Sequence, residues 1–274
     1  MTTRILVLVP CYNCRAQVPR VLRQFTAATA GHFEEVLVLD NHSTDDTVAQ
    51  ALAAMPQVHG ARVTVARNHR NVNLGGSHKA AFAYARRHGF THVAVLHGDD
   101  QGSLADLVAF MRGGAHLRHD ACLGARFQRG ARLQGYSRLR ILGNHVFNAL
   151  FTLGTGHAVH DLGSGLNLFG ERVFRDLPTD RYADDLRFNV FLLLGIIQSG
   201  CRYTYFPISW REDDQVSNVK MVSQATRTLD MLWRYRRAPQ RFLQGEHRDV
   251  PHDDYGFEVL GTHEPPDAGG VPSR

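Results

Sequence analysis

The chain has 274 residues, enough for one or two domains with a substantial core. Its composition, 43% hydrophobic and 21% charged, is that of a soluble globular protein, and a net charge of +5 favours an anionic ligand or an anionic membrane surface. Four cysteines exclude a dense disulfide framework, and the longest apolar run, at 190–197, is too short to span a membrane, so we expect a cytoplasmic protein with at most peripheral membrane contact.

The first half of the chain alternates between two periodicities. Short runs rich in β-branched and aliphatic residues predict strands, and the apolar residues between them recur at helical spacing. Strand–helix–strand repetition with almost continuously apolar strands indicates an α/β fold, with a mainly parallel sheet that helices cover on both faces. The predicted strands are Arg4–Val9, Val36–Leu39, Val63–Ala66 and His92–Leu96.

Three of these strands run into polar residues. Ligands of parallel sheets bind at the carboxyl ends of the strands, so we expect the three segments to line one shared site. Ordinary polar turns remain the alternative, although turns do not require so many carboxylates. The segments are Pro10-Cys11-Tyr12-Asn13, Asp40-Asn41-His42-Ser43 and His97-Gly98-Asp99-Asp100-Gln101.

The segment after the third strand combines glycines with a cation. Gly75 and Gly76 permit a close backbone approach, and Ser77 is expected to begin a helix whose amino end attracts anions. Lys79 adds a positive charge, but the spacing of a P-loop is missing. Contact with an anionic ligand and a purely structural glycine turn are both consistent with this pattern.

Residues 124–150 combine an arginine-rich stretch with an amphipathic helical pattern. Arginine pairs with phosphate in a bidentate manner. No RNA-binding or helix-turn-helix signature accompanies these arginines, so nucleic acid is not the expected partner, and a solvated surface remains an alternative. The apolar positions of the helix either contact a bilayer or belong to the core, which is the preferred interpretation; they are Leu139, Leu142, Val146 and Leu150.

The remaining segments complete one domain. The acidic pair Asp184-Asp185 precedes an apolar helix that ends near Gly200, residues 202–210 predict a strand, and residues 223–237 predict a helix. From about Gly245 the chain is rich in His, Asp, Pro and Gly, a composition typical of disorder. We therefore expect a single domain over 1–244 and a disordered tail over 245–274.

Several segments resemble, in order and spacing, those of family 2 glycosyltransferases. They are VPCYN, VLVLDNHSTDDT, NVNLGGSHKAAFAYA and HGDDQ, followed by GAR, DLGSGLNLF and FPISW as in the branch of dolichyl- and polyprenyl-phosphate sugar transferases. The resemblance spans about residues 4–220. It implies a GT-A (Rossmann-like) fold, with a nucleotide-binding half at about 1–123 and an acceptor half at about 124–244. The implied activity is metal-dependent, inverting transfer of a sugar from a UDP- or GDP-sugar to a polyprenyl phosphate at the cytoplasmic face of a membrane.

The resemblance also implies a divalent metal, Mn²⁺ or Mg²⁺, at the segment HGDDQ. Asp99 matches an aspartate of the family's Asp-x-Asp segment, and Gln101 matches a glutamine whose amide oxygen suits a hard cation. His97 departs from the family pattern, because it stands where the first aspartate is usual. Imidazole suits Mn²⁺ better than Mg²⁺; contact through water, or no contact, remains open for this residue.

Further site residues follow from the same resemblance. Tyr12 offers a stacking face to the base, Asp40 can accept hydrogen bonds from ribose hydroxyls or a base edge, and His42 stands where the family is often acidic, which leaves the base open. The residues expected to contact the nucleotide are Pro10, Tyr12, Asn13, Asp40, His42, Lys79 and Asp99, and those expected at the acceptor phosphate are Arg126, Arg140 and Asn144.

Asp184 and Asp185 fall where family members place acidic residues on the acceptor side, so together with Asp99 they are the candidate catalytic residues. A hydroxyl acceptor needs a general base, whereas a phosphomonoester, with a second pKa of about 6, is already largely ionised. Two alternatives therefore remain: transfer to a hydroxyl of a soluble glycan or small molecule, and a sugar-nucleotide-binding protein without transfer. The second is suggested by His97 and by GLNLF, where the lipid-phosphate branch usually carries an arginine.

Overall fold

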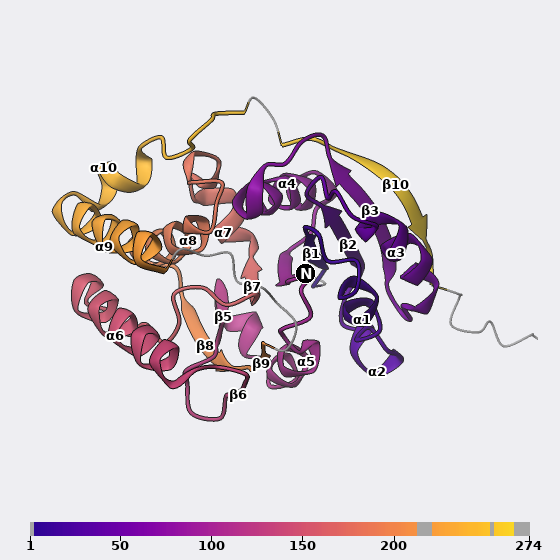
Figure 1. Cartoon of the computed structure of the whole chain (residues 1–274), viewed down its shortest axis with the longest axis horizontal. Coiled ribbons are helices and arrows are strands. Elements are labelled where there is room, and N and C mark those ends of the chain that lie inside the picture. Colours follow the sequence, from indigo (N-terminus) through magenta and orange to yellow (C-terminus); the bar gives the residue numbers. More distant parts are fainter. Residues whose placement is uncertain (1–2, 213–220, 253–254, 266–274) are drawn as a thin grey trace, which may run out of the picture.

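The computed structural model describes residues 3–212, 221–252 and 255–265. An eight-stranded sheet in the order β10-β3-β2-β1-β4-β7-β5-β8 forms its centre, and β6 and β9 make a separate two-stranded sheet (Figure 1). The strands are β1 (Ile5–Cys11), β2 (Glu35–Asp40), β3 (Arg62–Asn68), β4 (His92–Leu96), β5 (Ala121–Ala125), β6 (Arg132–Gln134), β7 (Leu166–Gly170), β8 (Tyr203–Pro207), β9 (Ser209–Arg211) and β10 (Phe257–His263).

Helices cover both faces of the sheet, as expected. One layer contains α1 (Val18–Leu22), α3 (Thr47–Ala54) and α5 (Leu104–Arg112), with α2 (Ala27–Ala30) beside them. The other contains α4 (Asn73–His88), α7 (Glu171–Asp176) and α8 (Arg187–Gln198), extended outward by α6 (Arg138–Thr155), α9 (Met221–Arg237) and α10 (Pro239–Gln244). Short 3₁₀ helices are η1 (Met55–Gln57), η2 (Ala115–Arg118) and η3 (Thr179–Arg181).

Strand β1 shows why both layers are needed. Leu6 and Leu8 belong to the apolar cluster under α4 and α8, whereas Val7 and Val9 belong to the cluster under α1, α3 and α5. Successive side chains of a strand point to opposite faces, so an apolar residue at every position needs cover on both sides. The near-continuous apolar strands of the sequence are thus explained.

The four predicted strands are confirmed and form the parallel part of the sheet. β1 pairs in parallel with β2 and β4, and β2 pairs in parallel with β3. β7 is antiparallel to both β4 and β5, whereas β8 is parallel to β5. The strand predicted at 202–210 divides after Pro207, because β8 pairs with β5 in the main sheet and β9 pairs with β6 outside it.

The expected disorder from residue 245 onward is wrong for part of that segment. Residues 257–263 form β10, which pairs antiparallel with β3 along the edge of the sheet (Figure 1). An edge strand has unpaired N–H and C=O groups that another strand can satisfy. The composition of the whole segment hid this one extended run, and residues 266–274 lie outside the described residues.

The helix expected to begin at Ser77 begins four residues earlier, at Asn73. Its first turn packs against the loop before α8: the Gly75 N–H donates to the Asp184 carbonyl at 2.5 Å, and a Cβ at position 75 would lie 2.6 Å from the Ala183 carbonyl oxygen. Gly75 is therefore required by a close approach of two backbones. Gly89 ends the helix in the left-handed conformation.

The apolar positions of α6 do not lie in the core, which corrects the preferred interpretation of that helix. Leu139, Leu142, Val146 and Leu150 are all exposed, whereas Asn148 and Phe151 are buried. The sequence shows that α6 is amphipathic, but only packing decides which face turns inward. Within the described ranges, no helix combines the length and hydropathy needed to cross a bilayer.

Gly75→Ala should destabilise the fold by about 3 kcal/mol. The added methyl group would clash with the backbone carbonyl oxygens of Ala183 and Asp184, and no side-chain rotation can relieve that clash. Urea denaturation checks this. The matched control is Gly143→Ala in α6, where an added Cβ meets nothing within 4 Å. That substitution should stabilise the protein by up to about 1 kcal/mol, and equal effects at the two glycines would contradict the packing described for Gly75.

Candidate active site

The loops after β1, β2 and β4 meet at one edge of the sheet. β1 lies between β2 and β4, and Cys11 at its end is in register with Asp40 at the end of β2. The Gly98 N–H donates to the Pro10 carbonyl at 3.1 Å, and the Asn13 N–H donates to Ser43 Oγ at 2.9 Å. Hydrogen bonds from backbone N–H groups thus join the three segments that the sequence predicts to share a site.

Each of the three loops contains a residue in the left-handed region of φ. Asn13, His42 and Asp100 have φ values of 51°, 64° and 59°. Asn, Asp and His tolerate this conformation better than other side chains, but it still costs about 1–2 kcal/mol per residue. Such strain persists where the surrounding structure enforces it and is common at functional sites.

Asp100 anchors the loop after β4. Its carboxylate is buried and accepts hydrogen bonds from Arg20 Nε at 2.7 Å and from Gln24 Nε2 at 3.1 Å, and it forms an ion pair with Arg211. Arg211 Nε also donates to the Asp100 carbonyl at 3.0 Å. The loop is therefore held from α1 on one side and from β9 on the other.

Asp99 lies beside this anchor, but its charge is not compensated. It is only partly buried, it accepts a hydrogen bond from the Gln101 N–H at 3.3 Å, and it makes no ion pair within the described ranges. Burial, with a contribution from the neighbouring Asp100 charge, raises the pKa of Asp99 to about 6. An oxygen ligand whose negative charge is unfavourable without a partner is suited to a cation.

His97 directly follows β4 and has an unsatisfied ring nitrogen. Its backbone N–H donates to the Gly165 carbonyl at 3.0 Å, and a Cβ at position 165 would lie 2.7 Å from the imidazole ring. Nε2 is buried without a hydrogen-bond partner among the described residues, which is unusual for a buried polar atom. Burial, together with the charge of Arg126, lowers the pKa of His97 to about 4, so the ring is neutral at pH 7 and able to ligate a metal.

Gln101 extends this site toward a polar groove. Its carbonyl accepts a hydrogen bond from the Arg211 N–H at 3.0 Å. A groove of about 820 Å³ lies beyond it, lined also by Arg20, Arg132 and Trp210, whereas Asp99 and His97 do not line it. No group of three His, Cys, Asp or Glu side chains in the described part of the chain is arranged to hold a metal. Asp99, His97 and Gln101 can therefore supply only part of a coordination shell.

The residues predicted around the nucleotide divide into exposed and structural groups. Tyr12 and His42 are exposed at the edge of the sheet. Asp40 is buried, where its carboxylate accepts a hydrogen bond from the Ser43 N–H at 3.1 Å and pairs with Arg67 Nε at 3.2 Å. Asp40 thus holds the loop after β2 through contacts inside the protein.

In the first loop, the exposed Asn13 and the buried Pro10 both have structural contacts. Asn13 Oδ1 accepts a hydrogen bond from the Thr44 N–H at 2.9 Å, and Pro10 is a buried residue of β1. Both residues shape the loop that carries the exposed Tyr12 ring.

Lys79 lies inside the protein and not on the ligand side predicted from the sequence. Its fully buried ammonium donates to the Tyr182 carbonyl at 2.6 Å, to Asp184 Oδ1 at 2.7 Å and to the Tyr255 hydroxyl at 3.1 Å. Burial lowers the pKa of Lys79, and the neighbouring Asp184 opposes this shift. The tertiary structure places the 182–184 loop over the first turns of α4, so Lys79 joins three segments in place of a nucleotide contact.

Asp184 and Asp185 diverge despite being neighbours. Asp184 is buried and accepts hydrogen bonds from Lys79 and from the Tyr255 hydroxyl at 2.8 Å. Asp185 is partly exposed and pairs with Arg187 Nε at 2.9 Å. Each carboxylate therefore already has a cationic partner.

The predicted acceptor arginines lie on either side of Tyr136. Arg126 forms a bidentate pair with Asp161 at 2.7 and 2.8 Å, and its Nη1 donates to the Tyr136 hydroxyl at 3.0 Å. Arg140 pairs with Glu212, and its guanidinium lies 4.9 Å from the centre of the Tyr136 ring.

Asn144 plays a different part from the two arginines. Its Nδ2 donates to the Arg140 carbonyl at 2.8 Å, within its own helix. The structure thus brings the two arginines together, whereas the Asn144 side chain supports the helix that carries Arg140.

Several residues of the site have no signal in the sequence. Arg20 and Arg211, the partners of Asp100, are 80 and 111 positions away from it along the chain. Asp161 and Glu212 could have been suspected only as acidic residues within or after recognisable motifs. Residue spacing reports local periodicity and does not report contacts of this range.

Comparison with known proteins gives a consistent picture. The family model described as "Glycosyl transferase family 2" matches residues 6–177. The chain is 27% identical over 224 residues to the polyprenol monophosphomannose synthase of Mycolicibacterium smegmatis, covering 77% of this chain and 78% of that protein. It is 34% identical over 92 residues to the undecaprenyl-phosphate 4-deoxy-4-formamido-L-arabinose transferase of Klebsiella pneumoniae, covering 33% of this chain and 25% of the relative.

Solved structures support the fold. The glucosyl-3-phosphoglycerate synthase of Mycobacterium tuberculosis, in complex with phosphoglyceric acid, aligns with a TM-score of 0.59 at 18% identity, covering 85% of this chain and 79% of that chain. Its complex with Mn²⁺, uridine-diphosphate-glucose and phosphoglyceric acid aligns with a TM-score of 0.58 over the same shares. At this identity the likeness establishes the GT-A-like α/β fold.

Asp99→Asn should stabilise the metal-free protein at pH 7.5 and leave its stability unchanged near pH 4. The folded state raises the pKa of Asp99 above its value in the unfolded chain, so the folded protein binds the proton more tightly and loses stability as the pH rises from about 4 to about 6. The asparagine variant lacks this loss, and the difference at pH 7.5 should be of the order of 1–3 kcal/mol.

Thermal denaturation in a chelator, at pH 4 and pH 7.5, measures this effect. Asp46→Asn is the control, because Asp46 is exposed at the start of α3 and its side chain makes no capping hydrogen bond. A wild-type protein more stable than Asp99→Asn at pH 7.5 would show that the charged carboxylate is already compensated.

Proposed function

Because the chain belongs to glycosyl transferase family 2, we propose that it is a metal-dependent, inverting enzyme that transfers a sugar from a UDP- or GDP-sugar to a polyprenyl phosphate. Two relatives named as polyprenyl-phosphate sugar transferases support the acceptor. A fold neighbour solved with Mn²⁺ and UDP-glucose supports the donor and the metal.

The observation that carries the proposal is the contrast between Asp99 and Asp100. Asp100 is compensated by two arginines, whereas Asp99 has no cationic partner within the described ranges and has a raised pKa. Asp99 would hold the cation, with the neutral His97 ring and the Gln101 amide oxygen as further ligands. A bound Mn²⁺ or Mg²⁺ supplies positive charge that stabilises the leaving diphosphate.

The nucleoside would lie over the ends of β1 and β2. The exposed Tyr12 ring offers a stacking face, and the exposed His42 ring offers a hydrogen-bonding group after β2. Asp40 and Asn13 would act mainly by holding the two loops, because their oxygens accept hydrogen bonds from the Ser43 and Thr44 N–H groups. Pro10 would support the nucleoside from its buried position near the end of β1.

Arg126 and Arg140 would bind the acceptor phosphate from either side of Tyr136. Arg126 is fixed by Asp161, so it presents a guanidinium of constant orientation. The Arg140–Glu212 pair is more exposed, and a phosphate, which can pair with a guanidinium in a bidentate manner, can replace the Glu212 carboxylate there. Asn144 supports the helix turn that carries Arg140.

The acceptor phosphate needs no general base, which agrees with the ion pairs that Asp184 and Asp185 already make. A phosphate oxygen would attack the anomeric carbon while the bond from that carbon to the donor diphosphate breaks, and the nucleoside diphosphate leaves with the electron pair. A single displacement of this kind inverts the anomeric centre. Asp184 and Asp185 are held by Lys79 and Arg187, so neither carboxylate is poised to accept the proton that a hydroxyl acceptor would release.

Transfer to a hydroxyl of a soluble acceptor is the alternative enzymatic reading, and Asp185 is its strongest support. The Asp185 carboxylate is partly exposed, and its partner Arg187 also pairs with Asp249 at 3.0 Å. Arg187 could therefore remain paired with Asp249 while Asp185 turns to a substrate hydroxyl.

For the location of the protein we favour the cytoplasmic face of a membrane, which agrees with its four free, buried cysteines.

The first prediction of the proposal concerns the donor. UDP or GDP, or one of their sugar conjugates, should raise the thermal stability with Mn²⁺ or Mg²⁺ but not in a chelator, by about 2.7 kcal/mol at 100 times the dissociation constant. Differential scanning fluorimetry measures the shift. Asp99→Asn should abolish its metal dependence, whereas Asp46→Asn should retain it. No shift with any nucleotide and metal pair would refute the proposed donor site.

The second prediction separates the two acceptor classes. With a polyprenyl-phosphate acceptor, Asp185→Asn should keep turnover within about tenfold of wild type, because removal of a true general base costs about 10²–10⁴-fold. Asp184→Asn should lower stability by leaving Lys79 buried without its anionic partner, so its turnover is measured at low temperature and per folded molecule. A fall of several decades in Asp185→Asn, with the fold intact, would favour a hydroxyl acceptor.

A further inference from the structure

The outer face of α6 exposes a continuous apolar stripe. Leu139, Leu142 and Leu153 are 75%, 60% and 75% exposed, and Val146 and Leu150 lie between them, also exposed. The spacing of three and four residues places all five side chains on one side of the helix. A contiguous exposed patch of this kind on a folded protein indicates a surface that another phase or molecule covers.

The inner face of the same helix already has its own apolar contacts: Phe151 is buried and Phe147 packs against the core, with polar side chains beside them. Asn148 is buried and its Nδ2 donates to the His160 carbonyl at 2.7 Å, Thr152 Oγ1 accepts a hydrogen bond from the Val159 N–H at 3.0 Å, and Thr155 Oγ1 donates to the Phe151 carbonyl at 2.7 Å. A helix that only covers a protein core has polar residues on its outer face. The leucines of α6 therefore do not serve the fold.

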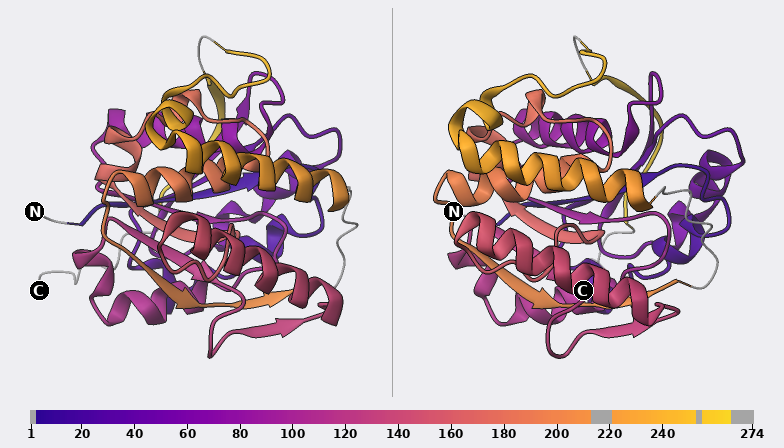
Figure 2. Two further views of the ribbon diagram at one scale, coloured as in Figure 1. Left: turned by 90° about the vertical axis from the view of Figure 1, so that its left-hand side faces the viewer. Right: turned by 60° about the vertical axis from the view of Figure 1, so that its left-hand side comes forward.

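Helix α9 widens this surface. α6 and α9 run side by side (Figure 2), and a Cβ at Gly154 would lie 2.6 Å from Leu232 Cδ1. Arg236 Nη1 donates to the Gly154 carbonyl at 3.1 Å, at the end of α6. On α9, Leu229 and Trp233 are both exposed. The exposed apolar side chains thus extend from one helix to the next.

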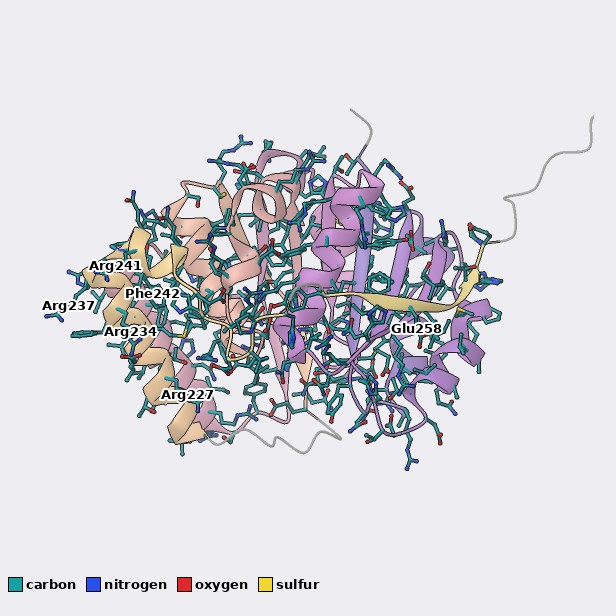
Figure 3. All side chains as sticks on the ribbon, turned by 90° about the horizontal axis from the view of Figure 1, so that it is seen from above. Arg227, Arg234, Arg237, Arg241, Phe242 and Glu258 are labelled. Atoms are coloured by element: carbon teal, nitrogen blue, oxygen red, sulfur yellow. The ribbon has the colours of Figure 1, made fainter. Side chains whose placement is uncertain are left out.

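Exposed arginines lie on α9 and α10, next to these apolar residues. Arg227, Arg234, Arg237 and Arg241 lie along the outside of α9 and α10 (Figure 3). The Arg237 guanidinium lies 4.3 Å from the centre of the Trp233 ring. Arg234 pairs with Asp230, which leaves a positive excess on this side of the molecule.

We propose that this α6–α9 face, defined by the five α6 residues above with Leu229, Trp233 and the four arginines, docks on a bilayer that contains anionic phospholipids. Both helices would lie in the headgroup plane, with leucines and tryptophan in the acyl boundary and arginines at lipid phosphates. A second copy of the chain fits less well, because it would place two arginine-rich faces against each other.

The docking surface follows from exposure and charge alone. Its purpose, the delivery of a lipid acceptor to the site, rests on the proposed function. Arg140 follows Leu139 directly in α6 and pairs with Glu212. A docked α6 would therefore hold the proposed acceptor arginine at the level of the lipid headgroups. A polyprenyl phosphate could then reach Arg140 without leaving the membrane.

Vesicle co-sedimentation tests the surface without any substrate. Wild type should bind vesicles of equal parts phosphatidylcholine and phosphatidylglycerol at least about tenfold more tightly than vesicles of phosphatidylcholine alone. Leu142→Gln/Leu153→Gln should lower binding to the mixed vesicles by at least about tenfold, and Arg237→Gln/Arg241→Gln should weaken it mainly at low salt. The control is Leu117→Gln, which changes a leucine that is 61% exposed but lies in η2, away from this face.

Transfer assays separate this inference from the proposed function. Leu142→Gln/Leu153→Gln should lose transfer to a long-chain polyprenyl phosphate in vesicles but keep wild-type transfer to a short-chain, water-soluble one. Vesicle binding without transfer to either acceptor would refute the proposed acceptor and leave the docking surface intact. Three results would overturn the docking surface. They are wild-type protein that binds neither kind of vesicle, unchanged vesicle binding by the double leucine variant, and a wild-type dimer that dissociates in this variant.

Discussion

The buried carboxylate of Asp100 is the interaction on which the geometry of the site depends. Arg20 and Gln24 hold it from the first helical layer, and Arg211 holds it from β9. A buried charge is stable only when paired and hydrogen-bonded, so these three residues fix the loop after β4 in one conformation. With Asp100 compensated inside, the adjacent, partly buried Asp99 is left without an ion-pair partner among the described residues.

A second buried charge connects the two halves of the chain. Lys79 in α4 is bound by the Tyr182 carbonyl, by Asp184 and by the Tyr255 hydroxyl, and β10 follows immediately after that tyrosine. The C-terminal segment therefore contacts the loop before α8 and then adds a strand to the edge of the sheet beside β3. Asp184 is positioned by this network, whereas Asp185 pairs with Arg187, so the two neighbouring carboxylates face different partners.

The exposed apolar stripe and Arg140 belong to the same helix, α6. This helix would connect the proposed docking surface to the proposed acceptor site. The same helix that presents leucines to the outside carries a guanidinium toward Tyr136 and Glu212. An enzyme that acts on an amphiphilic substrate must recognise an anionic headgroup while the apolar tail stays out of water. One amphipathic helix can satisfy both demands, because its two faces meet different environments.

The sequence by itself determined the strands β1 to β4 and the layered α/β fold, because these follow from local periodicity, and it placed the polar segment from His97 to Gln101 at the end of a strand. Only the tertiary structure decided that Lys79 is enclosed, that α6 turns its leucines outward and that residues 257–263 form a strand. It also decided that Asp100 and not Asp99 is the anchored carboxylate, since the anchoring arginines are 80 and 111 positions distant. Periodicity shows that a helix has two faces and that a charge needs a partner, whereas the choice of face and partner depends on long-range packing.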